Sequence, residues 1–133
     1  AYRLANFNSS GCFQDQAGQT GNNAPELAAS MYANYYKDIA ESWKMALSIN
    51  ANYQDDVYSN TDNDPNAFTE EYTKVNVSAS LQHSDGFEVS IFARNVTDEV
   101  TATQLLDLPL VPGSHFALWA PGKEFGISFR GKF

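Results

Sequence analysis

The strongest constraint on the fold is the alternation of apolar and polar side chains in residues 123–133. From residue 124 onward, every charged residue belongs to one row of alternate positions. The other row is uncharged and consists of Phe125, Ile127, Phe129, Gly131 and Phe133. Because successive side chains of a β-strand point to opposite faces, this period of two predicts a strand with one apolar face. About ten residues also suffice for a tilted strand to cross the hydrocarbon core of a bilayer.

Earlier stretches repeat this pattern at 26–36, 43–53, 72–82 and 87–94, and residues 2–7 match the end of another strand. The clearest stretch, 43–53, has an unbroken apolar row of Trp43, Met45, Leu47, Ile49, Ala51 and Tyr53. An amphipathic helix would instead need apolar residues at three- and four-residue spacing. In 26–36 the choice of face stays open, because both alternate rows mix apolar and polar side chains. The sequence therefore predicts an all-β, antiparallel fold.

Charges in the last four strands all lie opposite the apolar rows: Lys44, Lys74, Glu88, Arg94, Glu124, Arg130 and Lys132. A charge on the lipid face of a membrane strand costs roughly 2–4 kcal/mol at the bilayer midplane, whereas a lumen face tolerates it. The single-strand pattern alone would also suit an edge strand of a soluble β-sandwich. Taken together, the uncharged rows favour a transmembrane β-barrel segment of about five to six up-and-down strands.

The connections between these strands alternate in length. Residues 8–23, 54–71 and 98–122 are predicted to be long loops, whereas 37–42 and the Asp-Gly turn at 83–86 are short. Outer-membrane barrels combine short periplasmic turns with long extracellular loops. This asymmetry predicts that the carboxy terminus lies on the periplasmic side.

Composition excludes several other classes of protein. Sixteen acidic and eight basic residues give a net charge of −8, which argues against nucleic acid as a partner. The chain has no stretch of eighteen apolar residues that would predict a transmembrane helix. Cys12 is the single cysteine, so no internal disulfide is expected. The opening residues lack a signal-peptide pattern, which predicts either a mature form or a fragment.

Catalytic and metal-binding patterns are weak. Asn60, Asp62, Asp64 and Glu71 have the spacing of calcium-loop positions one, three, five and twelve, but Pro65 stands where that loop needs glycine. We interpret the stretch as a solvated acidic loop. His83 and His115 fall in different connections and do not suggest a metal pair. No arrangement of nucleophile, base and orienting group is present, so neither an enzyme nor a bound cofactor is predicted.

The loop at 101–121 carries too many apolar side chains for a loop that contacts only solvent. One interpretation is that its side chains cover a barrel mouth or contact neighbouring loops. The functional interpretation is that His115, Phe116 and Trp119 line an outer vestibule and contact a ligand.

Three short motifs resemble those of TonB-dependent outer-membrane receptors. These are Asn-Ala-Pro-Glu at 23–26, Phe-Ala-Arg-Asn-Val-Thr-Asp-Glu at 92–99, and Gly-Ile-Ser-Phe at 126–129 followed by the terminal Phe133. The Arg-Asn-x-Thr-Asp-Glu part is the most specific, although Val96 stands where the family usually has leucine.

The resemblance implies that residues 1–133 are the carboxy-terminal portion of a barrel of about 22 strands, with the plug domain and earlier strands supplied by the rest of the receptor. Such receptors lie in the outer membrane of Gram-negative bacteria and import a scarce nutrient, such as a ferric siderophore or a carbohydrate. The implied partners are outer-membrane lipid, the inner-membrane energy-coupling complex and the barrel-assembly machinery, which would read Phe133. Arg94 and Arg130 would face the lumen and contact the plug. The alternatives are a small self-contained structural or adhesive outer-membrane barrel and a soluble β-sandwich binding module.

Overall fold

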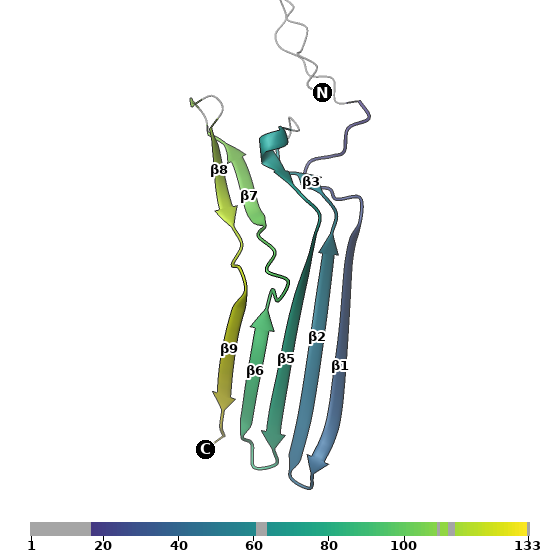
Figure 1. The fold of residues 1–133 in the computed structure, drawn as a ribbon, viewed down its shortest axis with the longest axis vertical. Helices are drawn as coiled ribbons and strands as arrows, with labels where there is room; N and C mark the ends of the chain where they lie inside the picture. Colours follow the sequence, from purple (N-terminus) through teal and green to yellow (C-terminus); the bar gives the residue numbers. More distant parts are fainter. Residues whose placement is uncertain (1–16, 61–63, 109, 112–113, 133) are drawn as a thin grey trace, which may run out of the picture.

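The computed structural model describes residues 17–60, 64–108, 110–111 and 114–132. Their main feature is a five-stranded antiparallel sheet in the order β1-β2-β5-β6-β9 (Figure 1). Its strands are β1 (Ala28–Ala40), β2 (Trp43–Gln54), β5 (Tyr72–His83), β6 (Glu88–Arg94) and β9 (Glu124–Arg130). Within this sheet, each strand pairs with the sheet strand that precedes it and the sheet strand that follows it along the chain. The predicted all-β antiparallel fold is therefore confirmed. Within the described residues the sheet is open, because β1 and β9 each have one partner strand.

Two hairpins lie in the connections that were expected to be loops. β3 (Val57–Tyr58) pairs with β4 (Phe68–Thr69) beside the short 3-10 helix η1 (Pro65–Ala67). β7 (Ala102–Asp107) pairs with β8 (His115–Trp119). The prediction of loops throughout 54–71 and 98–122 is therefore wrong in part. These strands are too short, and β7 too irregular, for a clear period of two to stand out.

The first strand is longer than predicted, and the connection after it is correspondingly shorter. β1 continues through Lys37 and Asp38, which pair with Met45 and Lys44 of β2. The expected connection 37–42 is thus a turn at Glu41 and Ser42. The polar side chains of this segment predicted a loop. Its first residues instead end β1, because their backbone groups form hydrogen bonds with β2.

The two ends of the sheet differ, as predicted from the connection lengths. The β1–β2 and β5–β6 turns lie at the end where the described chain also finishes after β9 (Figure 1). We call this the turn end. The hairpins β3–β4 and β7–β8 extend from the opposite end, which we call the distal end (Figure 1). Residues 2–7, Cys12 and Phe133 lie outside the described residues.

The strand register decides which side chains share a face. Ala33, Ile49, Val77, Ala93 and Phe125 form one continuous row across all five strands. The next row on this face joins Tyr35, Leu47, Ala79, Ile91 and Ile127. The face of β1, which its sequence left open, is thereby assigned, and we call the whole surface the apolar face. Among the described residues of these five strands, the apolar face carries one Lys, Arg, Asp or Glu side chain. This residue is Lys37, which lies close to the turn end.

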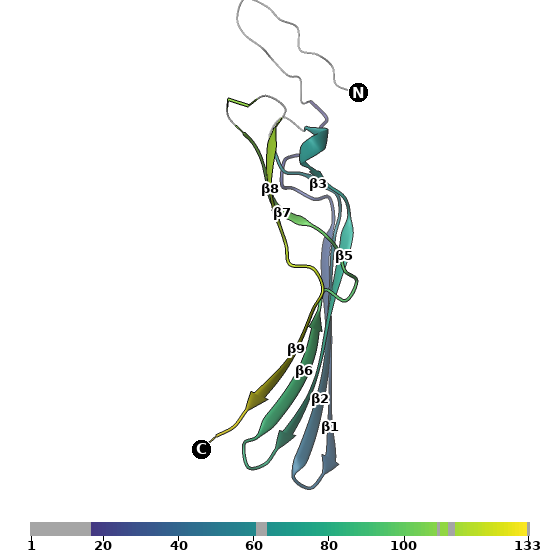
Figure 2. The same ribbon diagram turned by 60° about the vertical axis from the view of Figure 1, so that its left-hand side comes forward.

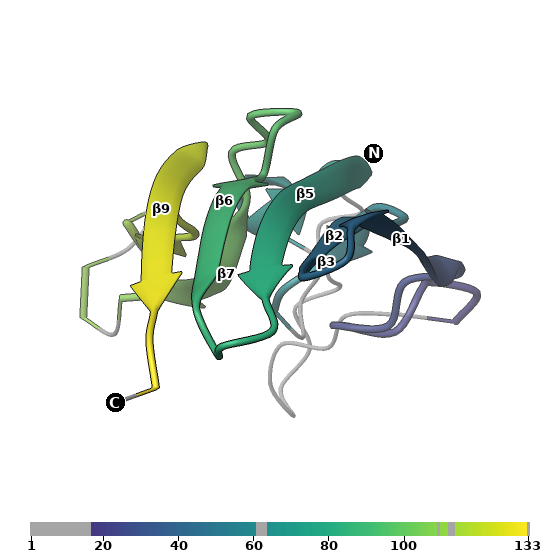
Figure 3. The same cartoon turned by 90° about the horizontal axis from the view of Figure 1, so that it is seen from below.

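Neither face of this sheet is covered by another layer of the described structure (Figures 2 and 3). All thirteen residues of β1 are exposed. On β9, Phe125 and Ile127 each keep 74% of their surface exposed. The buried apolar side chains are few and mostly small: Val57, Ala67, Ala93 and Leu105. An isolated soluble domain buries far more, so the apolar face is an exposed hydrophobic surface of the kind that marks a contact with another protein or a membrane. No helix among the described residues is long and apolar enough to span a membrane.

Candidate functional site

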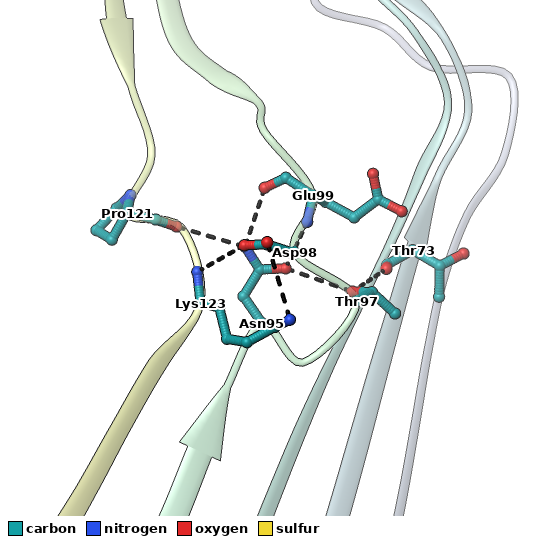
Figure 4. Close-up of polar contacts among 7 residues, drawn as sticks. All are labelled: Thr73, Asn95, Thr97, Asp98, Glu99, Pro121 and Lys123. Carbon is teal, nitrogen blue, oxygen red and sulfur yellow. Dashed lines mark hydrogen bonds and ion pairs between the residues drawn. The ribbon is translucent and has the colours of Figure 1, made fainter.

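The segment after β6 is a compact turn built around Asn95 (Figure 4). Asn95 is 5% exposed and has a positive φ of 48°, a conformation that Asn tolerates better than most residues. Its Nδ2 donates to the carbonyl oxygens of Glu99 at 2.9 Å and Pro121 at 3.5 Å. Its Oδ1 accepts from the Glu99 amide at 3.0 Å and lies 3.3 Å from Thr97 Oγ1. One side chain thus satisfies several backbone and side-chain groups at once.

Neighbouring residues of this turn bind the adjacent strands (Figure 4). Thr97 Oγ1 donates to the Thr73 carbonyl of β5 at 2.7 Å. Asp98 Oδ1 accepts from the Lys123 amide at 3.1 Å, and Lys123 Nζ lies 3.8 Å from Asp98 Oδ2. The Arg-Asn-x-Thr-Asp-Glu segment therefore connects β5, β6 and the residue that precedes β9. The polar side chains of Asn95, Thr97 and Asp98 are engaged in the fold, which indicates a structural role for these three residues.

The second face of the sheet, which we call the polar face, carries the two arginines predicted to face a lumen. Arg94 lies 3.6 Å from Glu124, its cross-strand partner, and its guanidinium sits 4.9 Å from the centre of the Phe92 ring. Arg130 lies 3.5 Å from Glu88. Both arginine side chains are largely exposed, so these pairs are weak and leave donors for another partner. Contact with a plug stays a prediction.

A close aromatic contact joins β6 and β9 on this face. Phe92 and Gly126 are direct cross-strand partners. A Cβ atom built on Gly126 would lie 2.2 Å from the tip of the Phe92 ring. Glycine is therefore required here for the ring to cover the neighbouring strand, an arrangement in which an aromatic side chain compensates for a strand glycine.

The distal end holds the residues predicted to contact a ligand. His115 and Trp119 lie on the same face of β8, with Ala117 between them, and line a groove of about 390 Å³ together with Phe68 and Tyr72. We call this the distal groove. Phe116 alternates onto the opposite face of β8 and does not line it. The structure thus brings together two of the three predicted residues.

His115 is also at the centre of a polar cluster that sequence reasoning missed. Its Nδ1 lies 2.8 Å from Asp107 Oδ1, and its Nε2 lies 3.7 Å from Asp64 Oδ2. Asn60 Nδ2 donates to the other carboxylate oxygen of Asp107 at 3.2 Å. Calcium-loop spacing groups Asp64 with Asn60, which the structure also places beside Asp107, with Asp62, which lies outside the described residues, and with Glu71. The structure groups it with residues of the β7–β8 hairpin, about fifty positions away, and no local signal could have revealed this.

Comparisons with known proteins do not assign the chain: no family model, no curated protein and no solved structure matches it. The resemblance to TonB-dependent receptors therefore stays a prediction based on three short motifs. The features of the chain that bear on function are the two unlike faces of the sheet and its two unlike ends.

Proposed function

We propose that this chain is the carboxy-terminal part of an outer-membrane β-barrel receptor that imports a scarce nutrient with energy from the inner membrane. The observation that carries the proposal is the apolar face, which continues across five strands with Lys37 as its one charge, near the turn end. The opposite face holds Lys74, Arg94, Glu124 and other polar groups. Lipid on one side and a polar lumen on the other account for both.

The lengths of the three longest strands suit this role. β1, β2 and β5 contain 13, 12 and 12 residues. At about 3.3 Å per residue each reaches roughly 40 Å, and a tilt of about 45° projects this onto roughly 28 Å. The hydrocarbon core of a bilayer is about 30 Å thick. Lys37 is close enough to the turn end to extend its ammonium group into the interface.

The open edges support a larger barrel. β1 and β9 each carry a row of backbone groups without a strand partner among the described residues. Such edges are excluded from lipid, because each unsatisfied group costs several kcal/mol there. Further strands of the same barrel are the natural partners of both edges. The small self-contained barrel is less well supported, since these five strands leave both edges to be paired.

The two ends suggest the orientation. The turn end would face the periplasm, and the distal hairpins would face outward. His115 and Trp119 would then present the distal groove to an incoming nutrient, with Phe116 on the other side of the same strand. Arg94 and Arg130 would face a plug in the lumen. Phe133, just beyond β9, would be read by the barrel-assembly machinery.

Adjacent residues in the middle of β5 provide the test. Val77 lies on the apolar face between Ile49 and Ala93, and Ser78 lies on the polar face between Ser48 and Phe92. We expect Val77→Arg to reduce folded receptor in the outer membrane, because arginine near the midplane costs roughly 2–4 kcal/mol on a lipid face. Ser78→Arg adds the same charge to the lumen side and should assemble nearly as wild type. Equal amounts of both variants in heat-modifiable form in outer-membrane fractions would contradict the proposal.

A further inference from the structure

We propose that Asp64 and His115, with Asp107 orienting the imidazole of His115, form a binding site for a divalent transition-metal ion such as Zn²⁺, between η1 and the β7–β8 hairpin. Ligand atoms from all three residues lie within 4.8 Å of one another. The site would hold whether or not the protein is a transporter, because it rests on the geometry of the distal end alone.

The contacts of His115 leave one ring nitrogen suited to a metal. Nδ1 lies 2.8 Å from Asp107 Oδ1, which is hydrogen-bond distance. A carboxylate can only accept, so Nδ1 carries the proton in this contact. In the neutral ring, Nε2 then keeps its lone pair. This is the arrangement in which a carboxylate orients a metal-binding histidine through the far side of the ring.

The distance from Nε2 to Asp64 suits a shared cation better than a hydrogen bond. Nε2 and Asp64 Oδ2 are 3.7 Å apart, which is too long for a hydrogen bond. Two ligand atoms bound to a tetrahedral zinc ion at 2.0–2.1 Å lie roughly 3.3–3.4 Å from each other. A small closing movement would therefore place one ion in contact with both atoms.

A second observation at the same place comes from Asn60. Its Nδ2 donates to Asp107 Oδ2 at 3.2 Å, so the amide borders the cluster. Its Oδ1 is completely buried and has no hydrogen-bond partner among the described residues. Leaving a buried acceptor without a partner costs about 1–3 kcal/mol. The unpaired oxygen therefore belongs to an amide that borders Asp107.

The backbone holds these three residues in place from two directions. Asp107 and His115 are cross-strand partners at the end of the β7–β8 hairpin. Asp64 caps η1, and its Oδ1 accepts from the Asn66 amide at 2.9 Å, which orients Oδ2 relative to His115. An ion here would bind the η1 segment to the hairpin. One imidazole with carboxylates suits zinc and related metals, whereas Ca²⁺ and Mg²⁺ prefer oxygen ligands alone.

Zinc stoichiometry tests the proposal in the full-length protein, purified in detergent, stripped with chelator and equilibrated with Zn²⁺. We expect His115→Gln and Asp64→Asn each to bind one zinc ion fewer per chain than wild type. Asp107→Asn should retain the ion with affinity lowered roughly 10–100-fold, as expected for a carboxylate that orients a ligand. His83→Gln is the matched control, because His83 lies at the turn end beside Asp85, and it should bind as wild type.

Chemical modification of the wild-type protein separates loss of a ligand from loss of the fold. Diethyl pyrocarbonate reacts with accessible imidazole nitrogens, and mass spectrometry resolves His115 from His83. Zinc should slow modification of His115 and leave His83 unchanged. Equal modification of His115 with and without zinc, or unchanged zinc stoichiometry in His115→Gln, would overturn the proposal and leave His115 as an ion-pair partner of the two aspartates.

Discussion

At the scale of single residues, Asn95 combines two properties that few side chains share. Its backbone adopts a φ of 48°, and its amide both donates and accepts hydrogen bonds within a site that is 5% exposed. Aspartate has nearly the same shape and tolerates the same φ, but when ionised it can only accept. A substitution of Asn95 by aspartate therefore removes hydrogen-bond donation while it keeps the shape of the side chain.

We expect Asn95→Asp to lower the free energy of unfolding by roughly 1–3 kcal/mol, because Nδ2 no longer donates and the new carboxylate oxygen faces the carbonyls of Glu99 and Pro121. The midpoint of urea unfolding, read from the heat-modified mobility of the protein, measures this change in stability. The control is Asn34→Asp on exposed β1, which makes the same chemical change. Similar shifts for the two variants would contradict the role given to Asn95.

At the scale of elements, β6 and β9 depend on a close fit in addition to their ladder of hydrogen bonds. Phe92 covers Gly126, and the Arg94 guanidinium lies over the same ring. The register also places Arg94 beside Glu124 and Arg130 opposite Glu88. The β6–β9 pair is therefore specified by side-chain shape and charge on the polar face.

Gly126→Ala should weaken the β6–β9 pair by about 1–3 kcal/mol, because the added Cβ would overlap the Phe92 ring. Gly131→Ala is the matched control, since its Cβ would meet Phe87 at an ordinary 3.4 Å. In the double variant Phe92→Ala/Gly126→Ala, the cost of the alanine at 126 should largely disappear. A double-mutant cycle on unfolding midpoints measures this coupling, and strictly additive effects would argue against a clash.

At the scale of the whole molecule, the sheet has two unlike faces and two unlike ends. Each of these differences predicts a difference in what surrounds the sheet on its two sides. The faces separate lipid from lumen in our proposal, and the ends separate the periplasm from the exterior. Asn66 in η1 and Ser84 in the β5–β6 turn are both exposed and lie at opposite ends of the sheet. They are suitable positions for probes of orientation.

In a background with Cys12 replaced by serine and no other free cysteine, an impermeant maleimide added to intact cells should label Asn66→Cys. Ser84→Cys should react only after the outer membrane is permeabilised, because short turns face the periplasm in this class of barrel. Labelling is read by mass shift on gels. Reaction of Ser84→Cys alone in intact cells would reverse the proposed orientation.

The sequence by itself determined the long strands and the Asp-Gly turn before Phe87, because side-chain alternation and turn chemistry are local properties. It also indicated the apolar rows of β2, β5, β6 and β9. Only the tertiary structure decided the face of β1, where the pairing of Ala33 with Ile49 settles an ambiguous pattern. It likewise decided that Arg94 lies beside Glu124 and that Asp64 meets His115. The first contact depends on strand register, and the second depends on the η1 segment and the β7–β8 hairpin meeting in space. The spacing of neighbouring residues encodes neither the register nor this meeting.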